Sequence, residues 1–518
     1  MNACGVPPHP NRVLPPEPPA AKSPIVREAA VIDVGSNSVR LVAYRLDGRS
    51  VTPFLNEKVM AGLGRNLATT GKLSPTGIEV ALKALSRFAM LIDGLGLKDV
   101  YAVATAAVRD AKDGAKFAER VRNETGIKLR VIEGAEEARL SALGVLAGAP
   151  EATGVVGDLG GSSLELVEVG PNGPGRGETW PLGPLSMMTG EPFDAERVAR
   201  VADAALTKSA VLRDAAPGSA FHAVGGAWRA LGRIDIALRR HPIGVLHHHQ
   251  MTRAEVLRVA EFVHKQSRKS LERFEEAAAK RADSLPYASV VLERVMALGA
   301  FDRVILSSYG LREGLLVQNT ARELRPLHPL VAGAESFAGG VPRTRAFGAA
   351  LEKWLAPAFE ALPAVFDRER DRVLRAAAAR LADIGAALHP EQRGELIYDL
   401  VLMAPFSGVS HAERAFLAAS VHHRYTRAAP DKKEAYARLL SEDQRRAAAA
   451  LGAALRLGAD LSGRAEPVLG AFDLLLSDGR LTLRADRAHG RLITEQAMKR
   501  LDALASVLGV VAGVSQPD

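Results

Sequence analysis

Two ten-residue stretches decide the fold: DVGSNSVRLV at residues 33–42 and DLGGSSLELV at residues 158–167. They align without a gap when the sequence is shifted against itself by 125 positions. Each places a Gly/Ser turn between two runs of apolar, partly β-branched residues, which predicts a β-hairpin. Two hairpins of one design predict an α/β fold in which two consecutive lobes face each other across a cleft.

The polar turns of the two hairpins suit a phosphate ligand. Glycine lets the backbone approach an anion and turn its N–H groups toward it, and serine hydroxyls add further donors. The alternative is that these residues only form tight turns, for which Asp, Asn, Gly and Ser are the usual choice. The in-register repeat favours a ligand, and the candidate residues are Asp33, Gly35, Ser36, Asn37, Ser38, Gly160, Gly161, Ser162 and Ser163.

An aspartate stands at the end of the first strand of each hairpin. A carboxylate at the end of a buried strand needs a cation, a donor or water, because burying it without a partner is costly. Asp33 and Asp158 could therefore hold Mg²⁺, directly or through water, between the protein and phosphate oxygens.

Outward from the hairpins the chain divides into further parts. Closely spaced prolines predict a disordered tail at residues 1–28. Alternating strands and helices predict α/β lobes at 29–150 and 151–320. Ala, Leu and Arg at helical spacing predict a helical domain at 321–460, and two strand-like segments followed by a helix predict a small α+β domain at 461–518.

The composition narrows the classes of molecule that the protein is expected to bind. The chain of 518 residues, 47% hydrophobic and 24% charged, is that of a globular multidomain protein. Its net charge of +8 favours polyanions, although a solvated arginine-rich surface explains the charge as well. Aromatics at 5%, without a basic stretch that interleaves them, argue against nucleic acid. One cysteine, no secretory signal and no apolar run of about 18 residues predict a cytoplasmic protein that does not span or bind a membrane.

Six segments of the chain occur in the order found in one enzyme family. They are DVGSNSVRLV, ATAAVRDA, EGAEEARL, DLGGSSLELV, the AVGG turn and SYGLREGLL. Through them, residues 29–320 resemble the exopolyphosphatase and guanosine pentaphosphate phosphatase family, which shares its fold with actin, acetate kinase and the sugar kinases. The resemblance continues more weakly beyond. It implies two actin-like (ribonuclease H-like) lobes forming a cleft, then a helical HD-like domain and the small α+β domain.

The resemblance also implies roles for individual residues. The glutamate that positions or deprotonates the attacking water falls on Glu137, with Glu136 as the alternative, at a predicted helix start where a carboxylate is favoured. Asp158 and Glu165 match metal ligands for Mg²⁺, and Arg109 matches an arginine that contacts phosphate oxygens. Without the resemblance, the glutamates could simply complement the helix start, Glu165 could lie on a polar strand face, and Arg109 could be an exposed strand-end residue.

Three places depart from the family pattern or stay open. Ser162 stands in place of a third glycine and Leu164 in place of a threonine, so one hydroxyl is lost from the second turn. Gly225 and Gly226 occupy the position where related kinases bind adenosine, and they serve either close packing or ligand contact.

Histidines in the second half form a separate question. The position of the His-Asp pair of HD phosphohydrolases reads Ala382-Asp383, so a working metal site is not expected there. A histidine run at residues 247–249 is interpreted as a surface or packing feature. The further histidines near the HD position are His389, His411, His422 and His423.

Together these observations favour an Mg²⁺-dependent exopolyphosphatase, which removes the terminal phosphate of inorganic polyphosphate. The alternatives are hydrolysis of guanosine pentaphosphate, a kinase that uses ATP, and a non-enzymatic sensor of polyphosphate or an alarmone. A homodimer through the helical half is expected by analogy alone.

Overall fold

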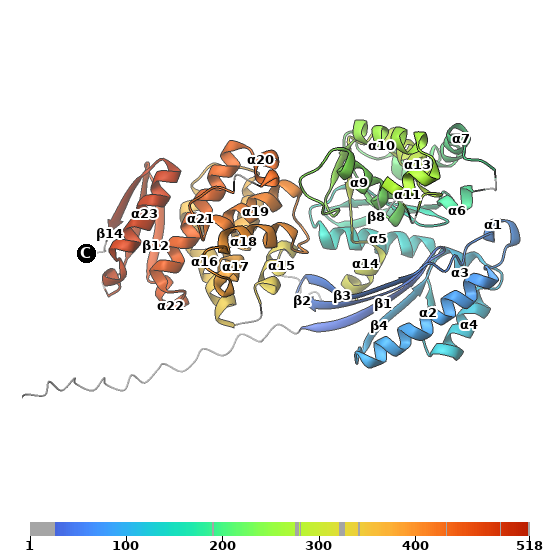
Figure 1. Cartoon of the computed structure of the whole chain (residues 1–518), viewed down its shortest axis with the longest axis horizontal. Coiled ribbons are helices and arrows are strands. Elements are labelled where there is room, and N and C mark those ends of the chain that lie inside the picture. Colours follow the sequence, from blue (N-terminus) through green and yellow to red (C-terminus); the bar gives the residue numbers. More distant parts are fainter. Residues whose placement is uncertain are drawn as a thin grey trace, which may run out of the picture.

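The computed structural model describes residues 26–188, 191–274, 279, 281–320, 327–339, 342–430, 433–486 and 488–515. The predicted tail falls mostly outside these residues. Its last part was placed wrongly, because strand β1 (Arg27–Val34) already includes Arg27 and Glu28 and pairs them with the next strand. The two lobes lie one above the other at one end of the molecule, with the helical part in the middle and a small strand-containing unit at the far end (Figure 1).

The first lobe is built on a five-stranded sheet of order β3-β2-β1-β4-β5. Strands β1 to β3 are antiparallel, and β4 and β5 continue parallel to β1. One face packs on α2 and α4 through a core that includes Ile32, Leu85 and Phe117. The remaining elements are β2 (Val39–Asp47), β3 (Ser50–Val59), α1 (Leu67–Thr70), α2 (Pro75–Gly94), β4 (Asp99–Ala104), α3 (Ala106–Asp110), α4 (Gly114–Thr125), β5 (Arg130–Val131) and α5 (Gly134–Gly148).

The second lobe repeats this topology. Its sheet has the order β10-β11-β9-β6-β7-β8, so β6, β7 and β8 are antiparallel, as are β1 to β3, and β9 and β11 run parallel to β6. The two predicted hairpins and the pair of lobes are therefore confirmed. The elements are β6 (Gly154–Leu159), β7 (Leu164–Gly170), β8 (Gly173–Trp180), α6 (Pro184–Met187), α7 (Ala195–Leu206), α8 (Ala210–Arg213), β9 (Ala220–Val224), α9 (Gly226–Leu238), β10 (Gln250–Thr252), α10 (Arg253–Lys265), α11 (Arg268–Phe274), α13 (Leu285–Leu298), β11 (Arg303–Leu306) and α14 (Leu311–Gln318).

Helices α5 and α14 lie together between the lobes (Figure 1). Helix α5 follows the first lobe in sequence but packs on the sheet of the second, whereas α14 ends the second lobe and contacts β1 of the first. Glycines permit this approach: a Cβ at Gly314 would lie 1.9 Å from the carbonyl oxygen of Leu140, and one at Gly144 would lie 2.0 Å from that of Gly310. Both helices begin at the cleft, so their first turns present side chains to it.

The second half of the chain is one helical body that ends in a small sheet. A single hydrophobic core joins helices of this half to β12 and β13, with Leu374, Leu455 and Leu483 among its fully buried residues. The elements are α15 (Pro329–Phe337), α16 (Pro342–Glu360), α17 (Arg368–Leu381), η2 (Ile384–Ala387), α18 (Arg393–Met403), α19 (His411–His423), α20 (Glu434–Leu439), α21 (Glu442–Ser462), α22 (Glu466–Leu469), β12 (Phe472–Ser477), β13 (Arg480–Ala485), η3 (Gly490–Leu492), α23 (Glu495–Leu508) and β14 (Val511–Ser515). Across the described part of the chain, none of the helices has the length and apolar character needed to cross a bilayer.

Candidate functional site

The two hairpin turns are closed in the same way. The N–H of Gly35 donates to the carbonyl of Ser38 at 3.0 Å, and that of Gly160 donates to Ser163 at 2.9 Å. The turns also meet: a Cβ at Gly161 would lie only 3.1 Å from the Cβ of Ser36. Glycine at that position therefore lets the two lobes bring their turns into contact.

Backbone hydrogen bonds orient the peptides of both turns. The carbonyls of Ser36 and Asn37 accept from Gly64 at 2.8 Å and Gly62 at 3.0 Å, and the carbonyl of Gly161 accepts from Leu185 at 2.8 Å. Because the C=O and N–H of a trans peptide point in opposite directions, the N–H groups that follow these carbonyls point away from those donors. Successive N–H groups in a Gly/Ser turn are the usual cradle for an anion.

Most of the residues predicted for the site line one cleft between the lobes. The exceptions are Arg109, Ser162 and Glu165. Helix α5 carries Glu137 into the cleft, whereas Glu136 is not among its lining residues and forms an ion pair of 2.5 Å with Arg130. The predicted residues that line the cleft are Asp33, Gly35, Ser36, Asn37, Ser38, Glu137, Asp158, Gly160, Gly161, Ser163, Gly225 and Gly226.

The carboxylates of Asp33, Glu137 and Asp158 line this cleft. Burial, reinforced by nearby Asp158, raises the pKa of Glu137 to about 8. Burial also raises the pKa of Asp158, although the hydroxyl of Ser141 donates to its Oδ2 and opposes that shift. Acids that share a site and repel one another in this way are typical of a place that binds a cation or a proton.

Glu165 is not among the residues that line the cleft. It faces Asp158 across the hairpin, in register on β6 and β7, and its side chain is 1% exposed. Neither of its carboxylate oxygens has a hydrogen-bond partner of normal geometry among the described residues. Burial, followed by the charge of Glu137, raises its pKa well above the ordinary value. The alternative reading of Glu165 as a residue on a polar strand face does not hold, because that face is buried.

This carboxylate set fits a magnesium ion held in part by its substrate. No three of these acids bring ligand atoms within 4.8 Å of one another, since the described residues offer only a histidine group at that spacing. Mg²⁺ does not need a full protein cage, because it usually keeps several waters and takes one or two carboxylates plus phosphate oxygens. The orphaned oxygens of Glu165 beside Asp158 provide the kind of oxygen ligand that such an ion requires.

Five basic side chains line the same cleft, and the sequence did not reveal them. Burial, followed by the charge of Arg312, lowers the pKa of Arg40 to about 10. Burial and then Arg281 lower the pKa of Lys58 to about 7. Arg312 Nη1 lies 3.2 Å from Asp33 Oδ2. The cations that line the cleft are Arg40, Lys58, Arg229, Arg281 and Arg312. Two of them, Arg40 and Arg312, stand in motif segments, where a scan of the motifs for arginine could have found them.

Two protein families match the chain, one over the two lobes and one over the second half. Residues 42–323, more than half of the chain, match the Ppx/GppA phosphatase family, and residues 330–514 match the C-terminal family of exopolyphosphatases. The chain belongs to the Ppx/GppA phosphatase family. Among its curated relatives, exopolyphosphatase 1 of Mycobacterium tuberculosis is 28% identical over 307 residues, which cover 57% of this chain and 88% of the relative. Exopolyphosphatase 1 of Mycobacterium leprae is 27% identical over 310 residues, with 57% and 89% covered.

Solved structures of this phosphatase family share the fold of the two lobes. The Ppx/GppA family member of Aquifex aeolicus has a TM-score of 0.50 at 24% identity, covering 57% of this chain and all of that one. An exopolyphosphatase from Cytophaga hutchinsonii has a TM-score of 0.52 at 22% identity, covering 56% and 97%. The resemblance to the family and the actin-like fold are thus confirmed, and the protein is an enzyme of the phosphatase type.

The alternative reading of Arg109 as an exposed residue at a strand end does not hold. It lies in the short helix α3 and not at a strand end, and only 15% of its side chain is exposed. Its Nη1 is 3.4 Å from Glu137 Oε2, and its Nε is 3.0 Å from Asp110. Arg109 and Ser162 line a second cavity. In this phosphatase Arg109 therefore contacts the candidate base directly.

The Gly225-Gly226 turn is covered by an arginine. Gly225 has φ of 104°, and a Cβ there would lie 2.4 Å from the carbonyl oxygen of Leu159. A Cβ at Gly226 would lie 2.1 Å from Arg281 Nη2. The turn therefore packs closely on β6 and on Arg281, which supports the packing role, and contact with a ligand stays a prediction.

The histidines divide into separate groups. Asp383 pairs with Arg424 and Arg464 at 3.4 Å each, and the described residues show no metal-binding group at that position. Of the surface and packing roles left open for the histidine run, the burial of His247 and His249 supports packing.

Proposed function

We propose that this protein is an Mg²⁺-dependent exopolyphosphatase, which hydrolyses the terminal phosphoanhydride of inorganic polyphosphate and releases orthophosphate. The observation that carries the proposal is that one cleft is lined by three carboxylates, four arginines and Lys58, together with the two Gly/Ser turns. The basic side chains can neutralise a polyanion, while the carboxylates serve the metal and the attacking water.

Glu137 is the proposed base. It reaches the cleft from the first turn of α5, where the helix N-terminus favours a carboxylate, and Arg109 holds one of its oxygens. A pKa near 8 matches the task, because a general base works best when its pKa lies near the working pH. In its ionised form it accepts a proton from the water that attacks the terminal phosphorus.

Asp158, with Glu165 behind it, is the proposed place for Mg²⁺. When bound, the ion neutralises phosphoryl oxygens in the transition state. The protein contributes the rest of the charge stabilisation through the turn N–H groups and the arginines. Catalysis of this kind depends mainly on positioning and electrostatics, as is usual for phosphoryl transfer.

The basic residues of the cleft favour a polymer over a nucleotide. Arg281 stands against the Gly226 turn, at the position where related kinases bind adenosine, and Arg40 and Lys58 extend the positive surface along β2 and β3. Successive phosphates of a chain can engage these cations together, which increases the avidity for long substrates.

The decisive experiment measures phosphate release from long-chain polyphosphate, guanosine pentaphosphate and ATP, each with and without Mg²⁺. We expect the highest kcat/KM for polyphosphate and loss of turnover when Mg²⁺ is removed. A higher kcat/KM for guanosine pentaphosphate would reassign the substrate, and tight binding without turnover of any of the three would refute the enzymatic proposal.

A further inference from the structure

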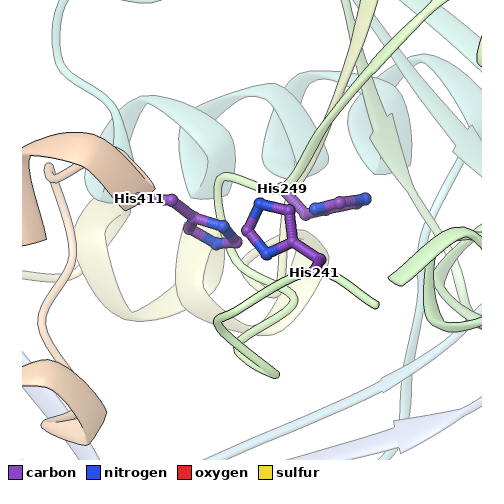
Figure 2. A group of neighbouring side chains, drawn as sticks. All are labelled: His241, His249 and His411. Atoms are coloured by element: carbon purple, nitrogen blue, oxygen red, sulfur yellow. The ribbon is translucent and has the colours of Figure 1, made fainter. Parts of the chain in front are cut away.

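Three histidines from distant parts of the chain form a group outside the catalytic cleft. His241 and His249 belong to the loop that follows α9 in the second lobe, and His411 is the first residue of α19 in the helical half. One ring nitrogen of each lies within 4.8 Å of the others. Figure 2 shows the three rings grouped, two on green segments and one on an orange segment.

The spacing of the rings matches a tetrahedral metal site. Their centroids are 5.1 Å apart for His241 and His249, 4.9 Å for His241 and His411, and 5.7 Å for His249 and His411. With Zn–N distances of about 2.0–2.1 Å and tetrahedral angles, three imidazoles on one zinc ion have centroids about 5 Å apart. The rings therefore need only small adjustments to share one ion.

Hydrogen bonds occupy the outer nitrogen of each ring. His249 Nε2 lies 2.8 Å from Asp235 Oδ2, His241 Nδ1 lies 3.1 Å from the carbonyl oxygen of Ile243, and His411 Nε2 lies 3.3 Å from that of His247. His249 Nδ1 is buried and without a hydrogen-bond partner among the described residues. A carboxylate behind one histidine and carbonyls behind the others are the usual support of a metal-bound imidazole.

The rings also lie beside a buried carboxyl group. Asp235, which is 2% exposed at its side chain, lies 2.8 Å from His249. The guanidinium of Arg239 lies 3.2 Å from Asp235 and 2.8 Å from Glu255.

We propose that His241, His249 and His411 bind one Zn²⁺ ion, with water as the fourth ligand, and that this ion fastens the second lobe to the helical half. Imidazole nitrogen is a good ligand for zinc, and a buried nitrogen without a partner is costly unless something binds it. The ion is separate from the Mg²⁺ of the catalytic cleft, because the two sites have different donors. The carboxylates suit a hard cation, and the imidazoles suit a borderline one.

The test is zinc binding to the full-length protein, stripped with a chelator and kept in excess Mg²⁺ so that carboxylate sites are filled. Isothermal titration calorimetry should give one Zn²⁺ per chain. His249→Ala and His411→Ala should each weaken binding by at least about 100-fold, and Asp235→Asn by about 10–100-fold through the orientation of His249. His389→Ala is the matched control, since that histidine is exposed in the same helical half, and it should bind zinc as the wild type does.

Zinc K-edge X-ray absorption of the wild-type protein tests the site without any variant. It should show three imidazole nitrogens at about 2.0–2.1 Å. A coordination shell of oxygens only, no zinc bound in the presence of Mg²⁺, or equal binding by the His411→Ala and His389→Ala variants would each overturn the proposal. Circular dichroism and retained phosphate release by the His411→Ala variant show that the fold survives the substitution.

Discussion

Replacing Glu137 by glutamine should separate catalysis from stability. The variant keeps the shape of the side chain and removes the base, so hydrolysis of polyphosphate should fall by about 10²–10⁴-fold, the usual contribution of a positioned base. That loss should appear in kcat, because the turns and arginines that bind the chain are unchanged. The substitution should at the same time make the protein more stable.

The gain in stability follows from the raised pKa of this carboxyl. Its pKa is about 8 in the folded protein and about 4.5 when exposed, first because of burial and second because of Asp158. The unfolded chain releases the proton above pH 4.5, whereas the folded chain keeps it up to about pH 8. Between these values the free energy of unfolding falls by about 1.4 kcal/mol per pH unit. Glutamine avoids this loss, so we expect a gain of about 3 kcal/mol at pH 7 and less than about 1 kcal/mol at pH 5.

The assay combines phosphate release with thermal unfolding at pH 5 and pH 7, without Mg²⁺. A gain of about 3 kcal/mol raises the unfolding temperature by roughly 2–4 °C for each kcal/mol in a unit of this size. The matched control is Glu136→Gln on the same helical turn, where the side chain pairs with Arg130 outside the cleft, and it should change neither quantity appreciably. Full activity of the Glu137→Gln variant, or a lower unfolding temperature at pH 7, would refute the reasoning.

Further predictions concern charged residues of the cleft. Arg40→Gln should lower kcat/KM for polyphosphate by about 10–100-fold, the worth of a charged hydrogen bond, and should reduce the slope of log kcat/KM against log salt by roughly 0.7, both measured by phosphate release. Asp158→Asn should raise the half-saturating Mg²⁺ concentration at least about tenfold in Mg²⁺ titrations of activity, because one anionic oxygen ligand is lost; an unchanged titration would exclude Asp158 as a ligand. At limiting Mg²⁺, kcat/KM should fall tenfold for each pH unit below about pH 8, because Glu137 is then protonated. As Mg²⁺ saturates, this acidic limb of the pH profile should move to lower pH. A cation near Asp158 opposes the repulsion that raises the pKa of Glu137. An acidic limb at the same pH with and without saturating Mg²⁺ would argue against coupling between Mg²⁺ and the pKa of Glu137.

The sequence was sufficient for the lobes and for the part of the site that lies on them. The hairpins at Asp33 and Asp158 combine local turn chemistry with strand patterning, so each half can be recognised without knowledge of the other. The start of α2 was equally local, because Ser74 caps it and Pro75 stands at its first position. The position of helix α5 between the lobes could not be predicted in this way. The helix follows the first sheet in sequence but packs on the second, and no local sequence pattern encodes which sheet it packs on.

The basic residues of the cleft escaped prediction for the same reason. Lys58, Arg229 and Arg281 come from separate elements, and each looks like an ordinary surface cation in its own segment. Their meeting depends on how the two lobes close on each other. Burial of Glu165 was also hidden, since alternation along a strand reports two faces but does not tell which of them is covered.

The distribution of charge in the cleft explains why metal and substrate belong to the same site. The pKa of Glu137 is raised partly by Asp158, and the pKa values of Arg40 and Lys58 are lowered partly by neighbouring cations, so like charges in the cleft repel one another. Ion pairs such as Arg312–Asp33 and Arg109–Glu137 relieve part of this repulsion. The remaining repulsion favours an added cation near the acids and an added anion near the basic residues. A phosphate chain and a divalent cation supply both at once, and because each also neutralises the other, binding of either favours binding of its partner.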